Sequence, residues 1–206
     1  MNTTGVAGLS NQVPPVDASA SYFVYFNRFD EQFESELQHR QVLLRSLTSA
    51  PADTPIDAHA YLHSFDLAYL FGSRRSGEIV GALLLGPSFP AARHAFLTLL
   101  SLDNRGQHRR LFEAVILAIG HLFESGKYQR LRWDIVGDNF TTIRSLSRRG
   151  TIEGVRRDWV YQEGAYRDAH LGSISWLEWQ RNMEPMRQRI RQRCDVPIRS
   201  DRPQTR

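Results

Sequence analysis

The sequence predicts a single α/β domain whose elements follow the order β-α-α-β-β-β-α-β-α-β-β. Three stretches support this prediction: a glycine-bounded hairpin at 72–77, a long amphipathic helix at 107–125, and a strand, capped helix and second hairpin at 132–176. A chain of 206 residues has the length of one ordinary domain with a sizeable core.

The first half is expected to begin with a flexible leader, residues 1–20, which are rich in Ser, Thr, Asn, Gly and Pro. The domain that follows, residues 21–179, opens with an aromatic strand at 22–29 and a helix that Asp30 caps. The next expected elements are a loop at 49–55, a short helix or irregular segment at 56–65, strands at 67–71 and 78–85, a break at Pro87–Pro90, and a strand at 94–102.

The second half carries the most specific pattern. The helix at 107–125 ends at Gly126 and turns an apolar stripe inward, formed by Leu111, Val115, Ala118, Ile119 and Leu122. After the strand Arg132–Val136, Asp138 and Asn139 cap a helix that Gly150 ends in a left-handed conformation. Strands at 155–162 and 166–176 follow, and a tight turn at Glu163-Gly164 joins them.

Charge separates this domain from the last residues of the chain. Residues 180–206 contain eight arginines and three acidic residues, a net charge of +5, so the first 179 residues carry about −1. Without interleaved aromatics, the basic segment is expected to be a solvated helix or a flexible end, and nucleic acid is not an expected partner. Because no apolar run reaches the length of a membrane span and Cys194 is the single cysteine, a cytoplasmic protein is expected.

The stretch from Arg132 to Trp179 resembles the C-terminal half of the GNAT acyltransferases, in particular the branch that acetylates N-termini of ribosomal proteins and many small amines. The matching residues stand in the family's order: Asp138, Asn139, Thr142, Arg144, Leu146, Gly150, Glu153, Gly154, Gly164, Arg167, Asp168, Glu178 and Trp179. The resemblance implies the GNAT fold, with a mixed, mostly antiparallel central sheet flanked by helices. It also implies acetyl-CoA or another acyl-CoA as co-substrate.

The resemblance further implies a pyrophosphate-binding turn at the start of the long helix, where free N–H groups and the helix dipole attract phosphate. Arg105 and Gly106 match the family's turn, whereas His108 and Arg110 stand where later glycines are usual. Three interpretations stay open. Arg105, Arg109 and Arg110 hold phosphates through their side chains, with Gln107 in the same turn. Alternatively the coenzyme site has been lost or reassigned, or these are solvated residues of a surface helix.

In the family, pantetheine pairs with a strand that opens away from its neighbour, which the resemblance places at Leu100, Ser101 and Leu102. It places Asn139 near the pantetheine arm, and Thr142 where the family often has a serine that protonates the leaving thiolate. Ser145 is a second hydroxyl for that step. For Thr142 and its neighbour Thr141, a role as helix-capping or first-turn polar residues is the alternative.

The amine acceptor is expected near the second hairpin, where Trp159 and Tyr161 offer aromatic faces and Asp134 offers a carboxylate for a substrate ammonium. Surface or ion-paired roles are the alternative for each. His59 and His63 share a helical face, but the sequence places no third ligand beside them. A surface or partly buried histidine pair is therefore expected, and no metal site.

These features predict transfer of an acetyl or other acyl group from acyl-coenzyme A to an amine of a small molecule or a protein N-terminus, by a monomer or homodimer. One alternative is a GNAT-fold enzyme that takes its acyl group from an acyl carrier protein or performs a non-transfer reaction on a small metabolite. A second is a non-catalytic binding protein of the same fold. No nucleic-acid or membrane partner is expected.

Overall fold

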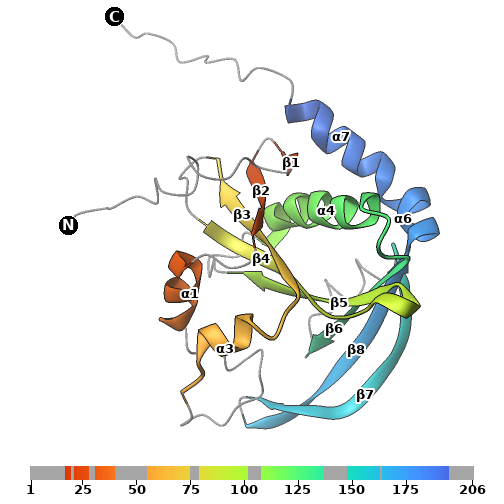
Figure 1. The fold of residues 1–206 in the computed structure, drawn as a ribbon. Coiled ribbons are helices and arrows are strands. Elements are labelled where there is room, and N and C mark those ends of the chain that lie inside the picture. Colours follow the sequence, from red (N-terminus) through yellow and green to blue (C-terminus); the bar gives the residue numbers. More distant parts are fainter. Residues whose placement is uncertain are drawn as a thin grey trace, which may run out of the picture.

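The computed structural model describes residues 17–19, 21–27, 31–39, 55–74, 79–101, 108–136, 148–162 and 164–194. Its strands form one eight-stranded sheet in the order β1-β2-β3-β4-β5-β6-β8-β7 (Figure 1). The strands are β1 (Asp17–Ala18), β2 (Tyr22–Asn27), β3 (Leu67–Ser73), β4 (Ile79–Phe89), β5 (His94–Ser101), β6 (Arg130–Val136), β7 (Thr151–Gln162) and β8 (Ala165–Ser175). Neighbouring strands pair antiparallel, except that β5 and β6 pair parallel. The expected mixed, mostly antiparallel sheet is confirmed.

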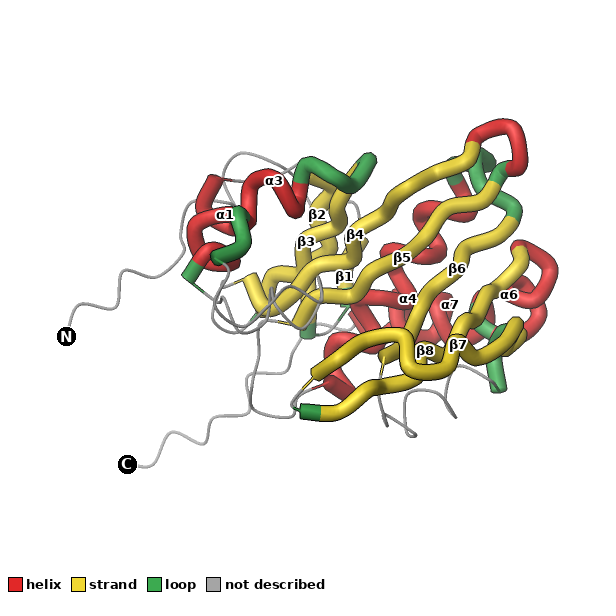
Figure 2. Tube along the Cα trace, turned by 90° about the horizontal axis from the view of Figure 1, so that it is seen from below, coloured by secondary structure: helices red, strands yellow, loops and turns green. Residues whose placement is uncertain are grey.

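Helices cover both faces of this sheet, as Figures 1 and 2 show. The helices are α1 (Glu31–Gln38), α3 (Ala58–Leu62), α4 (His108–Glu124), α6 (Trp176–Asn182) and α7 (Glu184–Cys194), with a 3₁₀ turn η2 (Pro90–Ala92). On one face, α4, α6 and α7 share an apolar core with β2–β6 and β8. On the other, Leu37 of α1 and Leu62 of α3 pack on alternate residues of β3, β4 and β5, such as Leu84 and Leu100.

The long helix α4 confirms the predicted amphipathic pattern. Leu111, Ala118 and Leu122 are buried, and Val115 and Ile119 pack against the same core. Gly126 follows the helix with φ +68°, and its N–H donates to the Phe123 carbonyl at 3.0 Å. The helix therefore ends as the glycine predicts.

Several sequence-based boundaries need correction. Asp17 and Ala18 of the expected leader pair with β2 as a short strand, and the buried Ser19 hydroxyl accepts the Tyr22 N–H at 3.0 Å. The expected break at Pro87–Pro90 is a register shift instead, because β4 pairs with β5 again through Phe89. The last expected strand ends at Ser175, whose side chain caps α6, so Trp176 is helical.

Gly150 was expected to adopt a left-handed conformation, and this prediction is wrong. The described glycines with positive φ are Gly86, Gly126 and Gly164. A Cβ at Gly150 would instead collide with the Ser173 carbonyl oxygen and press on the Trp133 indole. Glycine is therefore required at position 150 by the close approach of β8 and Trp133.

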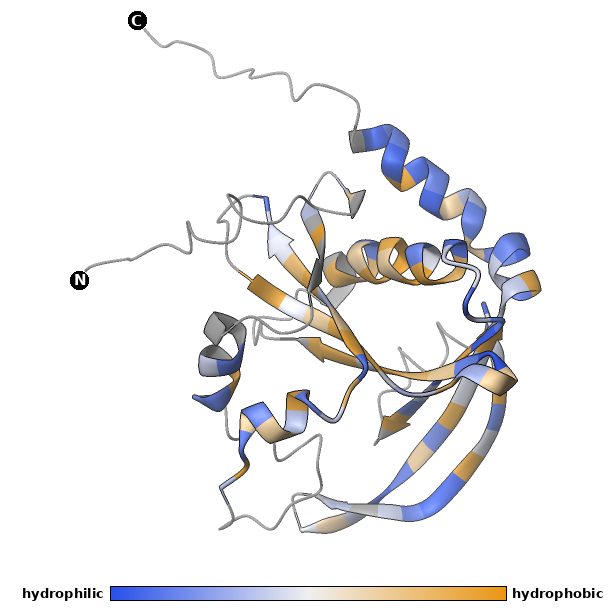
Figure 3. Cartoon of the chain, in the orientation of Figure 1, coloured by the Kyte–Doolittle hydropathy of each residue, from blue (hydrophilic) through white to orange (hydrophobic). Residues whose placement is uncertain are grey.

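The basic segment after Trp179 was expected to be a solvated helix or a flexible end. Its helix α7 is instead packed on the domain along one side. Figure 3 shows α7 hydrophilic along most of its length, yet Arg187 is fully buried and Ile190 nearly so. Arg187 lies across Gly120 of α4, where any Cβ would overlap its guanidinium. The two terminal nitrogens donate to both Glu124 carboxylate oxygens at 2.5 and 2.7 Å, so a bidentate ion pair holds α7 on α4.

Among the described helices, none has the length and apolar character needed to cross a membrane. Several expected features lie outside the described residues: the Asp30 cap, the loop before Pro55, the turn at 75–78, the capped helix after Asn139, and Glu163.

Candidate active site

The site is organised by the place where β5 and β6 stop pairing. Their parallel register runs from His94 opposite Arg130 to Leu97 opposite Trp133. Beyond it, β5 continues through Thr98–Ser101, paired with β4, and β6 continues through Asp134–Val136, paired with β8. We call these two segments the open ends; in Figure 1 the arrowheads of β5 and β6 point apart. Each open end thus has a backbone edge that faces the other strand without a described pair.

Trp133 marks the last paired position and is fixed by two glycines. A Cβ at Gly172, its partner on β8, would collide with the indole ring, and so would one at Gly150 to a lesser degree. The half-buried indole therefore lies close against the backbone of β8 and joins the α4-side core. This packing holds β6 on β8 while β5 stays with β4.

The open end of β5 carries two of the expected coenzyme-binding residues. Leu100 is fully buried in the core beneath α1 and α3, so its side chain is not available to a ligand. Ser101 is the last residue of β5. Leu99 precedes Leu100 and faces the other side of the sheet, the α4 side, like Leu97. The Leu99 side chain is 48% exposed. An exposed leucine at this position gives the open ends an apolar surface.

The start of α4 supports the expected phosphate turn in its position. His108, Arg109 and Arg110 form the first turn of this helix, which follows the open end of β5 after residues 102–107. A helix N-terminus that follows a strand with one open edge is a suitable anion site. Leu102, Arg105, Gly106, Gln107, Asn139, Thr142 and Ser145 lie outside the described residues, so their roles stay predictions.

Asp134 is the first β6 residue beyond the last β5–β6 pair. Leu131 belongs to the α4-side core, so strand alternation places Asp134 on the face that carries α1 and α3. Its carboxylate lies 3.5 Å from the Arg156 guanidinium. Partial burial raises the pKa of Asp134, and the positive charge of Arg156 offsets part of that rise.

Arg156 links Asp134 to Trp159, so the structure brings together two of the predicted acceptor residues. The Arg156 guanidinium carbon lies 4.5 Å from the Trp159 ring centroid, a cation–π distance. Trp159 is 53% exposed beside a register shift in β7. Asp168 holds that irregularity by accepting the Asp158 N–H at 3.0 Å and an Arg157 N–H at 2.6 Å.

Tyr161, the third predicted acceptor residue, lies two residues further along β7. It makes an edge-to-face contact with Tyr166 of β8, with ring centroids 5.2 Å apart. Both tyrosines are more than half exposed. Trp159, Tyr161 and Tyr166 therefore present aromatic surface near the hairpin end of β7 and β8, as expected for an acceptor platform.

A cavity of about 540 Å³ lies elsewhere, at the paired beginning of β5 and β6. Its lining includes His94, Arg130, Arg132 and Leu177. Because the strands are parallel, this cavity and the open ends lie at opposite ends of the β5–β6 pair.

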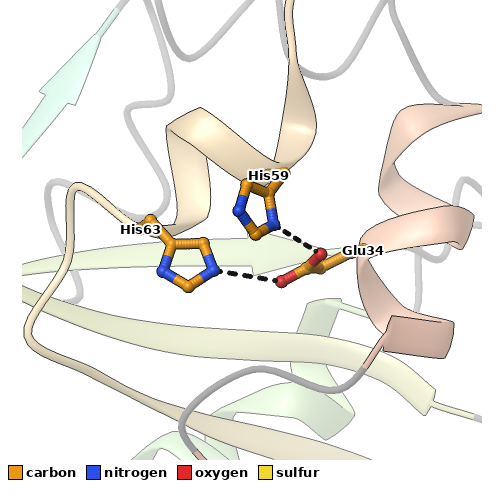
Figure 4. A group of neighbouring side chains, drawn as sticks. All are labelled: Glu34, His59 and His63. Carbon is orange, nitrogen blue, oxygen red and sulfur yellow. Dashed lines mark hydrogen bonds and ion pairs between the residues drawn. The ribbon is translucent and has the colours of Figure 1, made fainter.

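The sequence-based statement that His59 and His63 lack a third ligand is wrong. Glu34 of α1 contacts both rings from one side (Figure 4): its two carboxylate oxygens are 2.9 Å from His59 Nδ1 and 3.6 Å from His63 Nε2. The hydrogen bond that the His59 imidazole donates to the Glu34 carboxylate raises the pKa of His59. The sequence could not show this contact, because α1 and α3 are joined through residues 40–54 and no local pattern fixes their packing.

Comparison with known proteins bears on the fold. No protein-family model and no curated protein matches the sequence. Among solved structures, RimL, a ribosomal L7/L12 alpha-N-protein acetyltransferase, superposes in its apo form with a TM-score of 0.61 and 17% identity, covering 83% of this chain and 99% of that one. The chain has the GNAT fold.

Further structures agree with this assignment. RimL in complex with coenzyme A gives a TM-score of 0.59 at 16% identity, over 80% of this chain and 98% of that one. A ribosomal-protein-S5-alanine acetyltransferase from Vibrio fischeri gives 0.57 at 16% identity, over 77% and 97%. The resemblance read from residues 132–179 is thereby confirmed as a likeness of fold.

Arg156 and Glu34 are the two site residues that sequence reasoning missed. Arg156 belongs to a predicted strand, and alternation along β7 was the available signal that it shares a face with residues of the neighbouring strands. For Glu34, the sequence shows only that it belongs to an amphipathic helix, which does not indicate contact with His59 and His63.

Proposed function

We propose that this protein transfers an acyl group from acyl-coenzyme A to a primary amine. The observation that carries the proposal is the end of β5–β6 pairing at Leu97 and Trp133, which leaves two strand edges open beside the start of α4. Pantetheine contains two amide groups, so it can pair with an open strand edge in the manner of an added strand. The pyrophosphate then falls toward the helix N-terminus.

The reaction needs little chemistry beyond alignment. The amine nitrogen attacks the thioester carbonyl carbon, the carbon–sulfur bond breaks, the nitrogen loses a proton to become an amide, and the sulfur takes up a proton and leaves as a thiol. Backbone N–H groups on the open edge of β5 stabilise the oxyanion, and the two bound substrates react as neighbours. Thr142, or Ser145 beside it, is the proposed proton donor to sulfur.

Asp134 is the proposed partner of the acceptor amine. An incoming amine arrives as an ammonium ion and must lose a proton before it attacks. Asp134 stands at the first position of the open end of β6, and its raised pKa makes it a better proton acceptor than an aspartate of ordinary pKa. Trp159 and Tyr161 provide the aromatic surface over which the rest of the acceptor lies.

We further propose that the acceptor is a peptide α-amine or a small molecule amine. Two proteins of the same fold, RimL and the ribosomal-protein-S5-alanine acetyltransferase, are described as acetylating ribosomal proteins. The acceptor is tested by thiol release from acetyl-coenzyme A with a peptide bearing a free N-terminus. The same peptide with a blocked N-terminus is the control. Small-molecule amines as acceptors are tested in the same assay.

Coenzyme binding is tested by calorimetry with a matched pair of substitutions. Leu99→Trp fills the open ends, and Leu177→Trp makes the same change at an exposed α6 residue beside the other cavity. We expect coenzyme A and acetyl-coenzyme A to bind the wild type and Leu177→Trp equally, and Leu99→Trp at least about tenfold more weakly. The reverse pattern would move the coenzyme to the cavity at His94 and Arg130.

The phosphate contacts are tested in the same titration. Arg105→Ala and Arg109→Ala should each weaken coenzyme A, but not pantetheine, because pantetheine lacks the pyrophosphate. Failure of the wild type to bind coenzyme A at all contradicts the proposal. In that case, acyl transfer from a phosphopantetheine carrier protein, measured with the acylated carrier, distinguishes an enzyme that uses the carrier thioester from a non-catalytic protein.

A further inference from the structure

Two helices that precede β3 bring three metal-binding side chains together on the sheet face opposite α4. Leu37 of α1 packs with Ala58 and Leu62 of α3 in one buried cluster. The Gln38 side-chain oxygen also accepts the Ala58 N–H at 2.7 Å, which fixes the end of α1 against the beginning of α3. The positions of the side chains on these two helices are therefore set by the core beneath them.

His59 and His63 project from one face of α3, because residues four apart on a helix lie one above the other. Their ring centroids are 4.0 Å apart. Glu34 approaches from α1 with one oxygen toward each ring, at 2.9 and 3.6 Å (Figure 4). One ligand atom from each of the three side chains lies within 4.8 Å of the others.

The 3.6 Å contact between His63 and Glu34 already suits a single ion, whereas the 2.9 Å contact between His59 and Glu34 must widen to bind one. Zinc binds nitrogen and carboxylate oxygen at about 2.0–2.2 Å, so two ligands of one ion lie roughly 3.3–4.4 Å apart, depending on the angle between them. Both imidazoles are more than half exposed, so their χ angles can adjust, whereas the Glu34 side chain is 19% exposed and better held. The exposed side of the cluster leaves room for water.

We propose that Glu34, His59 and His63 bind one divalent transition-metal ion of the zinc type, with at least one coordination position open. Two imidazoles select such ions over magnesium and calcium, which prefer oxygen ligands. Two neutral imidazoles and one carboxylate leave a net positive charge on the bound ion, and three protein ligands with an open position are typical of catalytic rather than structural zinc. The site lies on the same face of the sheet as Asp134, the face that carries α1 and α3. The bound ion attracts an anionic or carbonyl group of a molecule that binds on this face.

The alternative occupant of this cluster is a proton. Glu34 then pairs with the protonated imidazoles, and nothing further binds. The two possibilities differ in how zinc binds. A metal site binds one zinc ion through all three side chains at once, whereas a cluster that holds only protons offers zinc no more than weak, independent binding at single histidines.

The test uses tag-free, full-length protein stripped of metal with a chelator, titrated with zinc chloride against a chromophoric chelator. We expect one zinc per chain, bound at least about tenfold more weakly after each of Glu34→Gln, His59→Asn and His63→Asn. His39→Asn is the matched control, because His39 is exposed at the end of α1 and its ring contacts the Ser35 carbonyl instead. This variant should bind zinc like the wild type.

Thermal unfolding completes the experiment and separates loss of binding from loss of fold. Without metal, the melting temperature of Glu34→Gln should be close to that of the wild type, since the change is isosteric. Added zinc should raise the melting temperature of the wild type and of His39→Asn only. Zinc binding that is equal in the wild type and Glu34→Gln, or weaker than that of the chelator in both, would overturn the proposal. Neither result depends on acyl transfer, so the two proposals fail separately.

Discussion

At the scale of single residues, three acidic side chains that carry the family resemblance and lie among the described residues serve the fold. Asp168 holds the irregularity in β7, and Glu178 closes the capping box of α6 with Ser175. Glu153 pairs with Arg130 and Arg132 on β6. Asp134, which is not part of that motif, is the carboxylate at the open ends. These three motif residues therefore stabilise the architecture, and the roles of Asn139 and Thr142 stay predictions.

Arg156 should control the proton affinity of Asp134. Arg156→Gln removes the positive charge that opposes the effect of burial, so the pKa of Asp134 should rise further. Carboxyl NMR titration measures this shift, and the acid limb of the kcat/KM profile should move to higher pH with it. Arg157→Gln is the control, because Arg157 pairs with Asp168 at 2.6 Å. A pKa of Asp134 that falls, or that shifts equally in both variants, would contradict the assignment.

At the scale of elements, glycine positions explain what local patterns left out. The antiparallel pairs β3–β4 and β7–β8, the positive φ of Gly164 and the helix α4 confirm what turn glycines and apolar periodicity predict. Gly120, Gly150 and Gly172 act differently, because each makes room for a large side chain from a distant element. A glycine inside a predicted helix, such as Gly120, signals close approach by some partner. The sequence did not identify that partner, Arg187, which lies 67 residues further along the chain.

The ion pair between α4 and α7 should be measurable as stability. Glu124→Gln leaves the buried Arg187 guanidinium with weaker partners, and we expect a loss of about 2 kcal/mol in the free energy of unfolding. Urea unfolding measures the loss, with Glu113→Gln on the same helix as control. Glu34 and Asp134 are far from this pair, so coenzyme and zinc binding should persist.

The same pair has a defined pH dependence. The hydrogen bond from Arg187 holds the pKa of Glu124 below its ordinary value of 4.5. A carboxyl whose folded pKa is lowered contributes stability above its unfolded pKa and loses it as the pH falls through the folded pKa. The difference in stability between wild type and Glu124→Gln should therefore shrink below pH 4.5 and stay constant above it. A difference that grows on acidification would mean that Glu124 is not the partner that matters.

At the scale of the whole molecule, the order of elements was enough to predict the fold, whereas the site depended on packing between distant segments. The contact of Glu34 with His59 and His63 and the bridge from Asp134 through Arg156 to Trp159 join strands or helices that the sequence cannot place side by side. The end of β5–β6 pairing is the exception, because the resemblance placed the opening of this strand at Leu100, Ser101 and Leu102, and pairing does stop just before them, at Leu97 and Trp133.

The central claim is that a coenzyme arm occupies the open ends of β5 and β6. Amide hydrogen exchange, recorded residue by residue with and without coenzyme A, tests it most directly. We predict slower exchange for the amides of Thr98–Ser101 that face β6, because pantetheine accepts their hydrogen bonds, while amides at the His94 and Arg130 end stay unchanged. Protection confined to the His94 end, or no change at Thr98–Ser101 at saturating coenzyme A, would contradict it.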